Sequence, residues 1–328
     1  MTHLIVPGDL QTDLFIIAFV GVIIGLYVLA NFGERSATPR ILTLIAGGVL
    51  AGLSSLIGVL GSLLHLLAYS AGGETAATFR LDEQTLLPFA AAGILGLVYL
   101  VPAVQRAVAR LLPIRPGSPV IYLTVVLGLL LVAQQLGAQI QSQLPLTYGE
   151  LLAQDIPFLI LAFVGVGIFI RRSPRETIER LGLTRPAKRY WWLVGVVGIG
   201  VFLAIAFGIE SVANVVAPEQ QKKVTDVSNV LFSHFNNPGA IIFLGLVAAV
   251  VEETLFRGAM QPRLGILVTS ILFAALHTQY AVSFATLEVF VLGLGLGWLR
   301  AQSGSTLPGM VTHAGYDIAV GLIPFVFK

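Results

Sequence analysis

Long runs of apolar residues, separated by short polar segments, dominate the chain. Each run is about 20 residues long, which is the length an α-helix needs to cross the hydrocarbon core of a bilayer. The helices of a soluble core would show narrower amphipathic stripes instead. The pattern therefore predicts an all-α, polytopic transmembrane bundle with about ten spans. We place the spans at residues 13–31, 41–70, 85–110, 118–138, 151–170, 190–216, 238–261, 265–281, 284–300 and 306–326.

The composition supports a membrane protein. Of the 328 residues, 56% are hydrophobic and only 11% are charged, whereas a soluble domain has about 25% charged residues. The formal net charge of +2 is small and does not indicate a nucleic-acid partner, so membrane lipid is the expected environment. The chain has no cysteine, which excludes disulfides, thiol catalysis and thiolate metal sites.

Positive residues are distributed unevenly between the two sets of loops. With the N-terminus outside the cytoplasm, the inner loops contain 15 Lys and Arg residues, seven of them from Arg171 to Arg189. Cytoplasmic loops carry an excess of Lys and Arg, so this distribution predicts a multi-pass plasma-membrane protein with an extracytoplasmic N-terminus. The outer set contains only Arg80, Lys222, Lys223 and Lys328.

One apolar run, from Pro238 to Met260, contains three ionisable residues. Such residues cost several kcal/mol inside a membrane unless they are paired or hydrated, so they indicate function by default. Glu253 and Arg257 are four residues apart with the acid first, which favours an ion pair on one helix face. Glu252 points about 100° away from that face and has no such local partner. We expect Glu253 and Arg257 to support the structure and Glu252 to be available for chemistry.

Two later spans contain histidine at helical spacing. Phe273 precedes His277 by one turn, and His313 precedes Asp317 by one turn. An aspartate one turn from a histidine can fix its tautomer or bind the same atom. With a rise of 1.5 Å per residue, the two histidines, Asp317 and Glu252 would all lie roughly 10–18 Å inside the membrane. The sequence therefore predicts one hydrated site that opens to the cytosol.

Three motifs resemble the signature of the CPBP family: Glu252-Glu253-xxx-Arg257, Phe273-xxx-His277 and His313-xxx-Asp317. This family comprises the CAAX proteases and the bacteriocin-processing (Abi) intramembrane proteases, which are related to the Rce1 endopeptidase. Residues 179–183 resemble a Leu-Gly-Leu segment that often precedes this core, and residues 304–307 resemble the segment before its last histidine helix. Asp317 stands where the family also has Asn. The resemblance divides the chain into transmembrane helices of unassigned role at 1–145 and a CPBP-like protease core at 146–328.

The resemblance implies an intramembrane endopeptidase that hydrolyses a peptide bond of a membrane-associated substrate, such as a prenylated CAAX protein. Glu252 would be the general base that activates a water molecule, and His277 would hold or orient that water. His313 and Asp317 would position the water or stabilise the oxyanion. In this scheme the catalytic residues are Glu252, His277, His313 and Asp317, and the structural support comes from Glu253, Arg257 and Phe273.

The metal content stays open at this point. The family is commonly labelled metallo-, and His277, His313 and Glu252 would be the ligands of a zinc ion with an open coordination position. The zinc-protease motif H-E-x-x-H is absent. A metal-free glutamate mechanism agrees equally well with these residues.

Two other functions use the same residues. A secondary transporter or proton relay would also need intramembrane acids and histidines. However, the candidates lie only in the C-terminal half and have no inverted counterpart in the first half. A non-cleaving immunity or scaffold relative is the third hypothesis, against which the retention of every motif residue argues. The sequence does not indicate an oligomeric state.

Overall fold

The computed structural model describes residues 10–70, 83–141 and 144–326, and this part of the chain forms helices and no β-strand. Lys222 and Lys223 lie on a helix, whereas Arg80 and Lys328 lie outside the described residues. The helices are α1 (Leu10–Gly33), α2 (Ala37–Ser70), α3 (Glu83–Val98), α4 (Pro102–Val108), α5 (Pro119–Gly137), α6 (Tyr148–Val166), α7 (Pro174–Leu181), α8 (Tyr190–Val216), α9 (Pro218–Leu231), α10 (Pro238–Glu252), the π-helix η1 (Glu253–Met260), α11 (Gln261–Ala275), the 3₁₀ turn η2 (Thr278–Tyr280), α12 (Phe284–Ser303) and α13 (Leu307–Val326).

The all-α, polytopic prediction is confirmed. In the described residues, six helical stretches are long and apolar enough to cross a membrane, and the number rises to seven if a bent pair forms one span. The six include α2, α5, α6, α8 and α12, together with the continuous stretch Pro238–Ala275. That stretch contains two of the expected spans, which meet at a kink where Gly265 has φ +78°. The count of ten spans stays a prediction.

The expected span at residues 85–110 is not one straight helix. It consists of α3 and α4, whose axes are bent by 101°. Pro102 begins α4, and a proline cannot continue a preceding helix because it has no N–H to donate. It also restricts Val101 to an extended conformation, observed at φ −69° and ψ 120°. The hydropathy of this segment was recognised correctly, but its direction changes inside it.

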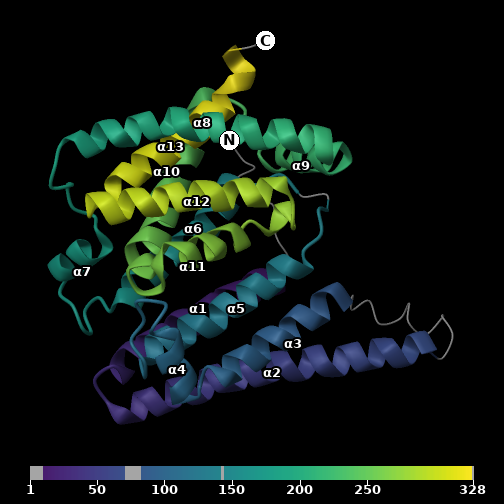
Figure 1. Ribbon diagram of the computed structural model, residues 1–328, viewed down its shortest axis with the longest axis vertical. Coiled ribbons are helices and arrows are strands. Elements are labelled where there is room, and N and C mark those ends of the chain that lie inside the picture. The colour runs from purple at the N-terminus through teal and green to yellow at the C-terminus, as the bar shows by residue number, and fades with distance from the viewer. Residues whose placement is uncertain (1–9, 71–82, 142–143, 327–328) are drawn as a thin grey trace.

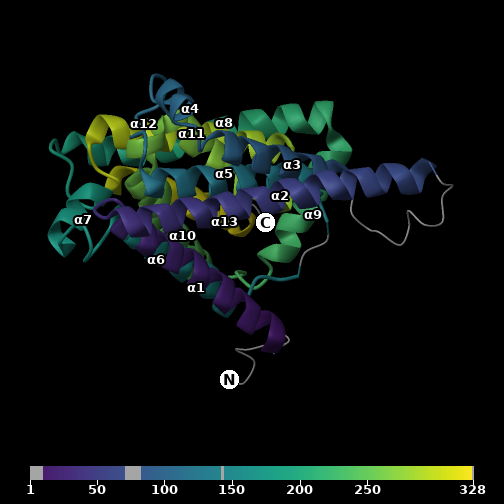
Figure 2. The same cartoon turned by 90° about the horizontal axis from the view of Figure 1, so that it is seen from below.

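Two helices of the first half of the chain, α5 and α6, pack against the C-terminal helices. In Figure 1, α2 and α3 lie at the bottom of the molecule and α8, α10, α12 and α13 lie toward the top; Figure 2 shows the same helices from below, with α2 crossing in front of the C-terminal helices. Between them, α5 packs against α11, and α6 packs against η1 and α10. The helices that carry the motifs are therefore supported directly by helices from the first half of the chain.

Three glycines of α12 permit close packing with its neighbours. A Cβ atom on Gly293 would lie 3.2 Å from the ring of Phe273, and one on Gly297 would lie 2.7 Å from Ile266. On another face, a Cβ on Gly295 would lie 2.8 Å from the ring of Phe202 on α8. Any larger side chain at Gly293 would displace Phe273, so this packing places a motif residue directly.

The two short segments that resembled the family outside the motifs bind each other. Gly182 ends α7 at φ +69°, and its carbonyl accepts a hydrogen bond from the backbone N–H of Thr306 at 2.8 Å. The hydroxyl of Thr306 donates to the carbonyl of Leu181 at 2.6 Å. Arg180 donates to the carbonyl of Gly258 in the π-helix at 2.7 Å. This connection fixes the start of α13 relative to η1, and these are the two elements that carry the acidic and histidine motifs.

Candidate active site

The acidic motif lies where an α-helix widens into a π-helix. α10 ends at Glu252 and continues into η1, which begins at Glu253. π-helical turns are rare and frequently occur at functional sites. The sequence predicted an ordinary α-helix here, with the two glutamates pointing in different directions. In the structure both carboxylates reach the same histidine, His313.

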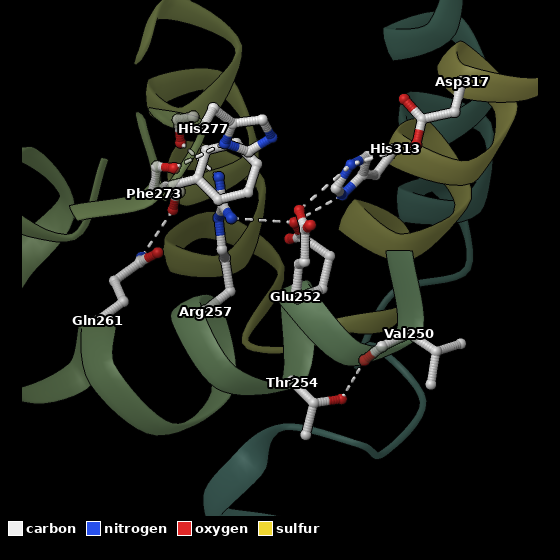
Figure 3. A network of polar contacts seen from close by, with 12 residues as sticks. Val250, Glu252, Thr254, Arg257, Gln261, Phe273, His277, His313 and Asp317 are labelled. Atoms are coloured by element: carbon white, nitrogen blue, oxygen red, sulfur yellow. Dashed lines mark hydrogen bonds and ion pairs between the residues drawn. The ribbon is translucent and has the colours of Figure 1, made fainter. Parts of the chain in front are cut away.

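His313 of α13 lies at the centre of the site, as Figure 3 shows. Its Nδ1 atom is 3.1 Å from Oε1 of Glu253. Its Nε2 atom is 3.5 Å from Oδ2 of Asp317 and 3.8 Å from Oε2 of Glu252. Both ring nitrogens therefore face carboxylate oxygens. The structure brings together three of the four predicted catalytic residues around one imidazole.

The expected ion pair between Glu253 and Arg257 forms, with 3.1 Å between Oε1 and Nη1. Its side chains are 0% and 1% exposed, whereas those of Glu252 and Asp317 are 16% and 31% exposed. Only the latter two acids can meet water or a substrate. The pair is nevertheless more than a local helix contact, because the same Glu253 oxygen accepts from His313. Glu253 therefore contacts the predicted catalytic residue His313 in addition to its structural partner Arg257.

Phe273 separates the charged groups and orients both histidines. The guanidinium carbon of Arg257 lies 4.1 Å from the centre of the Phe273 ring, a cation–π contact. The rings of His277 and His313 meet the same phenyl group edge to face, with centroid distances of 5.2 and 5.9 Å. An aromatic ring at this place excludes water from the ion pair and determines the space between the two imidazoles.

His277 lies just beyond its helix, although the spacing predicted a position on the helix face. α11 ends at Ala275, so His277 belongs to the following turn. Its Nδ1 atom is 3.0 Å from the carbonyl oxygen of Phe273. Since a carbonyl only accepts, we assign the hydrogen to Nδ1, which leaves the lone pair of Nε2 available. In Figure 3 the imidazole of His277 lies beside the ring of Phe273.

The turn that carries His277 is held by α5. Ala281 adopts φ +48°, which is uncommon for a residue with a side chain. Its carbonyl accepts hydrogen bonds from the amide of the buried Gln135 and from the hydroxyl of Thr286. The 15 residues of α11 extend only about 22 Å, short of a hydrocarbon core of about 30 Å. Irregular backbone at membrane depth needs such internal partners.

Replacing Gln135 by Leu should therefore disturb the site from a distance. We expect a loss of about 1–3 kcal/mol in stability, because buried polar groups lose a partner. We also expect a lower kcat, because the turn carries His277. Gln220→Leu is the matched control, since Gln220 donates to the same turn, at the carbonyl of Val282, from an exposed position. Thermal unfolding and cleavage kinetics of both variants test this, and equal effects would contradict it.

Asp155, which lies on α6, is a further buried acid that was not predicted from the sequence. Its side chain is buried, with 6% exposure of the residue, and its Oδ2 atom has no hydrogen-bond partner among the described residues. Its helix packs against α10 and η1, which carry Glu252 and Glu253. The signal was present in the sequence, because Asp155 is an isolated acid in an apolar run, the criterion that singled out Glu252. It adds another acid to the side of the site formed by the first half of the chain.

The zinc site with His277, His313 and Glu252 as ligands stays a prediction. Among the described residues, no group of three or more His, Asp or Glu side chains is placed to hold a metal ion. Nδ1 of His313 is in hydrogen-bond contact with Glu253, whereas its Nε2 faces the carboxylates of Asp317 and Glu252.

Comparison with known proteins connects this site to a family. Residues 234–319 match the family of Rce1-like type II CAAX prenyl endopeptidases. The chain is 35% identical over 138 residues to an uncharacterized 24.3 kDa protein of Escherichia coli, a match that covers 37% of the chain and 58% of that protein. It is 29% identical over 161 residues to the uncharacterized protein YpbD of Bacillus subtilis strain 168, covering 47% and 78%.

The chain thus spans less than two thirds of the first of these relatives. No solved structure matches the chain. The segment from 234 to 319 contains all three motifs and the π-helix that carries Glu253 and Arg257. Its match to the Rce1-like endopeptidases confirms the resemblance of this chain to the CPBP family.

Proposed function

We propose that the protein is an intramembrane endopeptidase in which Glu252 is the general base. The observation that carries the proposal is the accessible Glu252 carboxylate beside His313, next to a pair of groups, Glu253 and Arg257, that is closed to solvent. This arrangement separates a reactive carboxylate from the charges that hold it. A site of this kind suits proton abstraction from water, because the base keeps a fixed position while remaining reachable.

The residues suggest the following steps. Glu252 accepts a proton from a water molecule, and the oxygen of that water attacks the carbonyl carbon of the scissile peptide bond. Nε2 of His277 accepts a hydrogen bond from the other O–H group of the water, which keeps that hydrogen, and so orients the water. The Nε2–H group of His313 stabilises the oxyanion of the tetrahedral intermediate. Asp317 orients this group, since its Oδ2 atom lies 3.5 Å from Nε2. Glu252 then returns its proton to the departing amine as the C–N bond breaks.

The substrate class follows from the setting of the site. The stretch Pro238–Ala275, which carries Glu252, is apolar enough to cross a membrane, so a membrane-associated peptide is the substrate that can reach the site. The Rce1-like match points further, to proteins with a prenylated CAAX-type C-terminus. The positive residues of the inner loops support a plasma-membrane orientation in which the N-terminus is extracytoplasmic and the site opens to the cytosol.

Cleavage by the purified full-length protein in proteoliposomes tests the proposal. We expect a membrane-anchored peptide to be cut at one bond, with both products identified by mass spectrometry, and a prenylated peptide to be cut faster than the same peptide without the lipid. Metal chelators should leave the rate unchanged, because no step above uses a metal. Ion or solute flux without cleavage would instead support the transporter hypothesis, and neither activity would support a non-cleaving relative.

A further inference from the structure

A large, partly open cavity of about 1210 Å³ lies outside the candidate active site. It is lined by α1, α5 and α6 on one side and by η1 and α11 on the other. Its volume exceeds the ~300–1,000 Å³ typical of small-molecule sites. None of the four proposed catalytic residues lines it. The nearest wall to the site is formed by Leu255, Phe256, Leu272 and Leu276.

The cavity extends along the membrane direction of α6. Lining residues occur from Thr147, before the start of this 19-residue helix, to Val166 at its end. That length corresponds to about 28 Å, close to the ~30 Å thickness of a hydrocarbon core. The middle of the cavity is apolar and is lined by Phe19, Ile23, Leu131, Phe158 and Leu161. Its long apolar part matches hydrocarbon chains rather than a polar solute.

One end of the cavity is strongly basic. Glu34 is the single acid at this end, and it lies 3.9 Å from an arginine. Three of the arginines donate mainly to backbone carbonyls or to the amide oxygen of Asn31, which accept hydrogen bonds without offsetting charge. The arginines that line this end are Arg115, Arg171, Arg172, Arg180 and Arg263.

The charge at this end is poorly compensated. Burial lowers the pKa of Arg180 to about 10, and repulsion from Arg263 and Arg172 acts in the same direction. Burial likewise lowers the pKa of Arg171 to about 10. A guanidinium remains protonated at neutral pH, so these shifts mean that several positive charges are partly desolvated and close together. An anion bound among them would relieve that cost.

We propose that this cavity binds an anionic phospholipid. Its phosphodiester head group pairs with Arg171, Arg172 and Arg263, and its acyl chains occupy the apolar part between α1, α5 and α6. The planar fork of arginine matches phosphate oxygens in two parallel hydrogen bonds. Basic pockets between transmembrane helices on the cytoplasmic side are typical binding sites for lipid head groups. The lipid would connect the first half of the chain to η1, beyond any role in peptide cleavage.

Binding of individual lipids to the purified full-length protein tests this site, with native mass spectrometry as the readout. We expect phosphatidylglycerol to bind more tightly than phosphatidylcholine. Arg263→Gln should weaken the binding of phosphatidylglycerol about fivefold, which corresponds to about 1 kcal/mol per basic residue. The binding of phosphatidylcholine should not change. Arg263 makes no hydrogen bond or ion pair with the described residues, so this variant should fold. Arg185→Gln, an exposed change outside the cavity, is the matched control.

A second variant tests the apolar part. Ala153 lines the cavity from α6, so Ala153→Trp places an indole in it. This variant should weaken the binding of both lipids. Equal effects of Arg263→Gln and Arg185→Gln, or equal binding of the two lipids, would overturn the proposal. Displacement of phosphatidylglycerol by excess inorganic phosphate would overturn the lipid as the source of the anion. The readout is lipid binding, so its failure does not depend on whether the protein cleaves peptides.

Discussion

Glu252→Gln is expected to reduce peptide cleavage by about 10²–10⁴-fold, the usual contribution of a general base. Glutamine has the size and shape of glutamate but cannot accept a proton from water. The fold should be unaffected, because the Glu252 side chain is partly exposed and lies 3.8 Å from Nε2 of His313, beyond hydrogen-bond distance. The measurement is kcat on a membrane-anchored peptide, with thermal unfolding of the same preparation.

Glu210→Gln provides the matched control, since Glu210 is an exposed acid in the apolar helix α8. It should retain full activity. Substantial cleavage by Glu252→Gln would remove Glu252 as the base. If Asp155→Asn or Asp317→Asn then abolished cleavage, the base would be one of those two carboxylates. A loss of activity together with a loss of folding would be uninformative for Glu252, and this is why the unfolding measurement belongs to the experiment.

The apolar pattern predicted the helices better than their directions. The span expected at 190–216 coincides with α8, because the length of this apolar run determines where the helix begins and ends. The run at 85–110 was likewise predicted as one span, yet α3 and α4 meet there at 101°. Hydropathy indicates which residues avoid water, but it does not indicate where a helix bends. Pro102 was the only local signal, and a proline inside an apolar run does not by itself fix an angle.

Local contacts of the site were predictable, whereas those across the chain were not. The pairs Glu253–Arg257 and His313–Asp317 are four residues apart, so helical periodicity alone brings them together. The contact of His313 with Glu253 joins two separate helices and depends on how they pack. The position of His277 depends on where α11 ends and on a turn held by Gln135, which lies far away in sequence.

The π-helix shows the same limit. The residues from Glu253 to Met260 have no composition that distinguishes them from an α-helix, and the sequence predicted one. In the structure their carbonyls meet Arg180 from α7 and their charged side chains meet α12 and α13. The widened helix is thus determined by contacts with three other elements, which a reading of one segment does not contain.

Arg257→Met is expected to cause the largest loss of stability, about 3–5 kcal/mol, the cost of breaking a buried ion pair by removing one partner. The change leaves the carboxylate of Glu253, which is 0% exposed, without its cation. It also removes the hydrogen bond to the carbonyl of Gly293 and the contact with the ring of Phe273. Thermal unfolding in detergent measures the loss, and Arg175→Met, at an exposed ion pair, should change stability little.

Two double variants separate stability from catalysis. Glu253→Gln with Arg257→Met removes both charges and keeps an oxygen that accepts from Nδ1 of His313, so it should recover most of the lost stability and part of the cleavage. Glu253→Leu with Arg257→Met should recover stability but not cleavage, because His313 loses the partner that orients it. If neither double variant is more stable than Arg257→Met, the buried charge is not the cause of the loss. If both cleave equally well, Glu253 has no part in orienting His313.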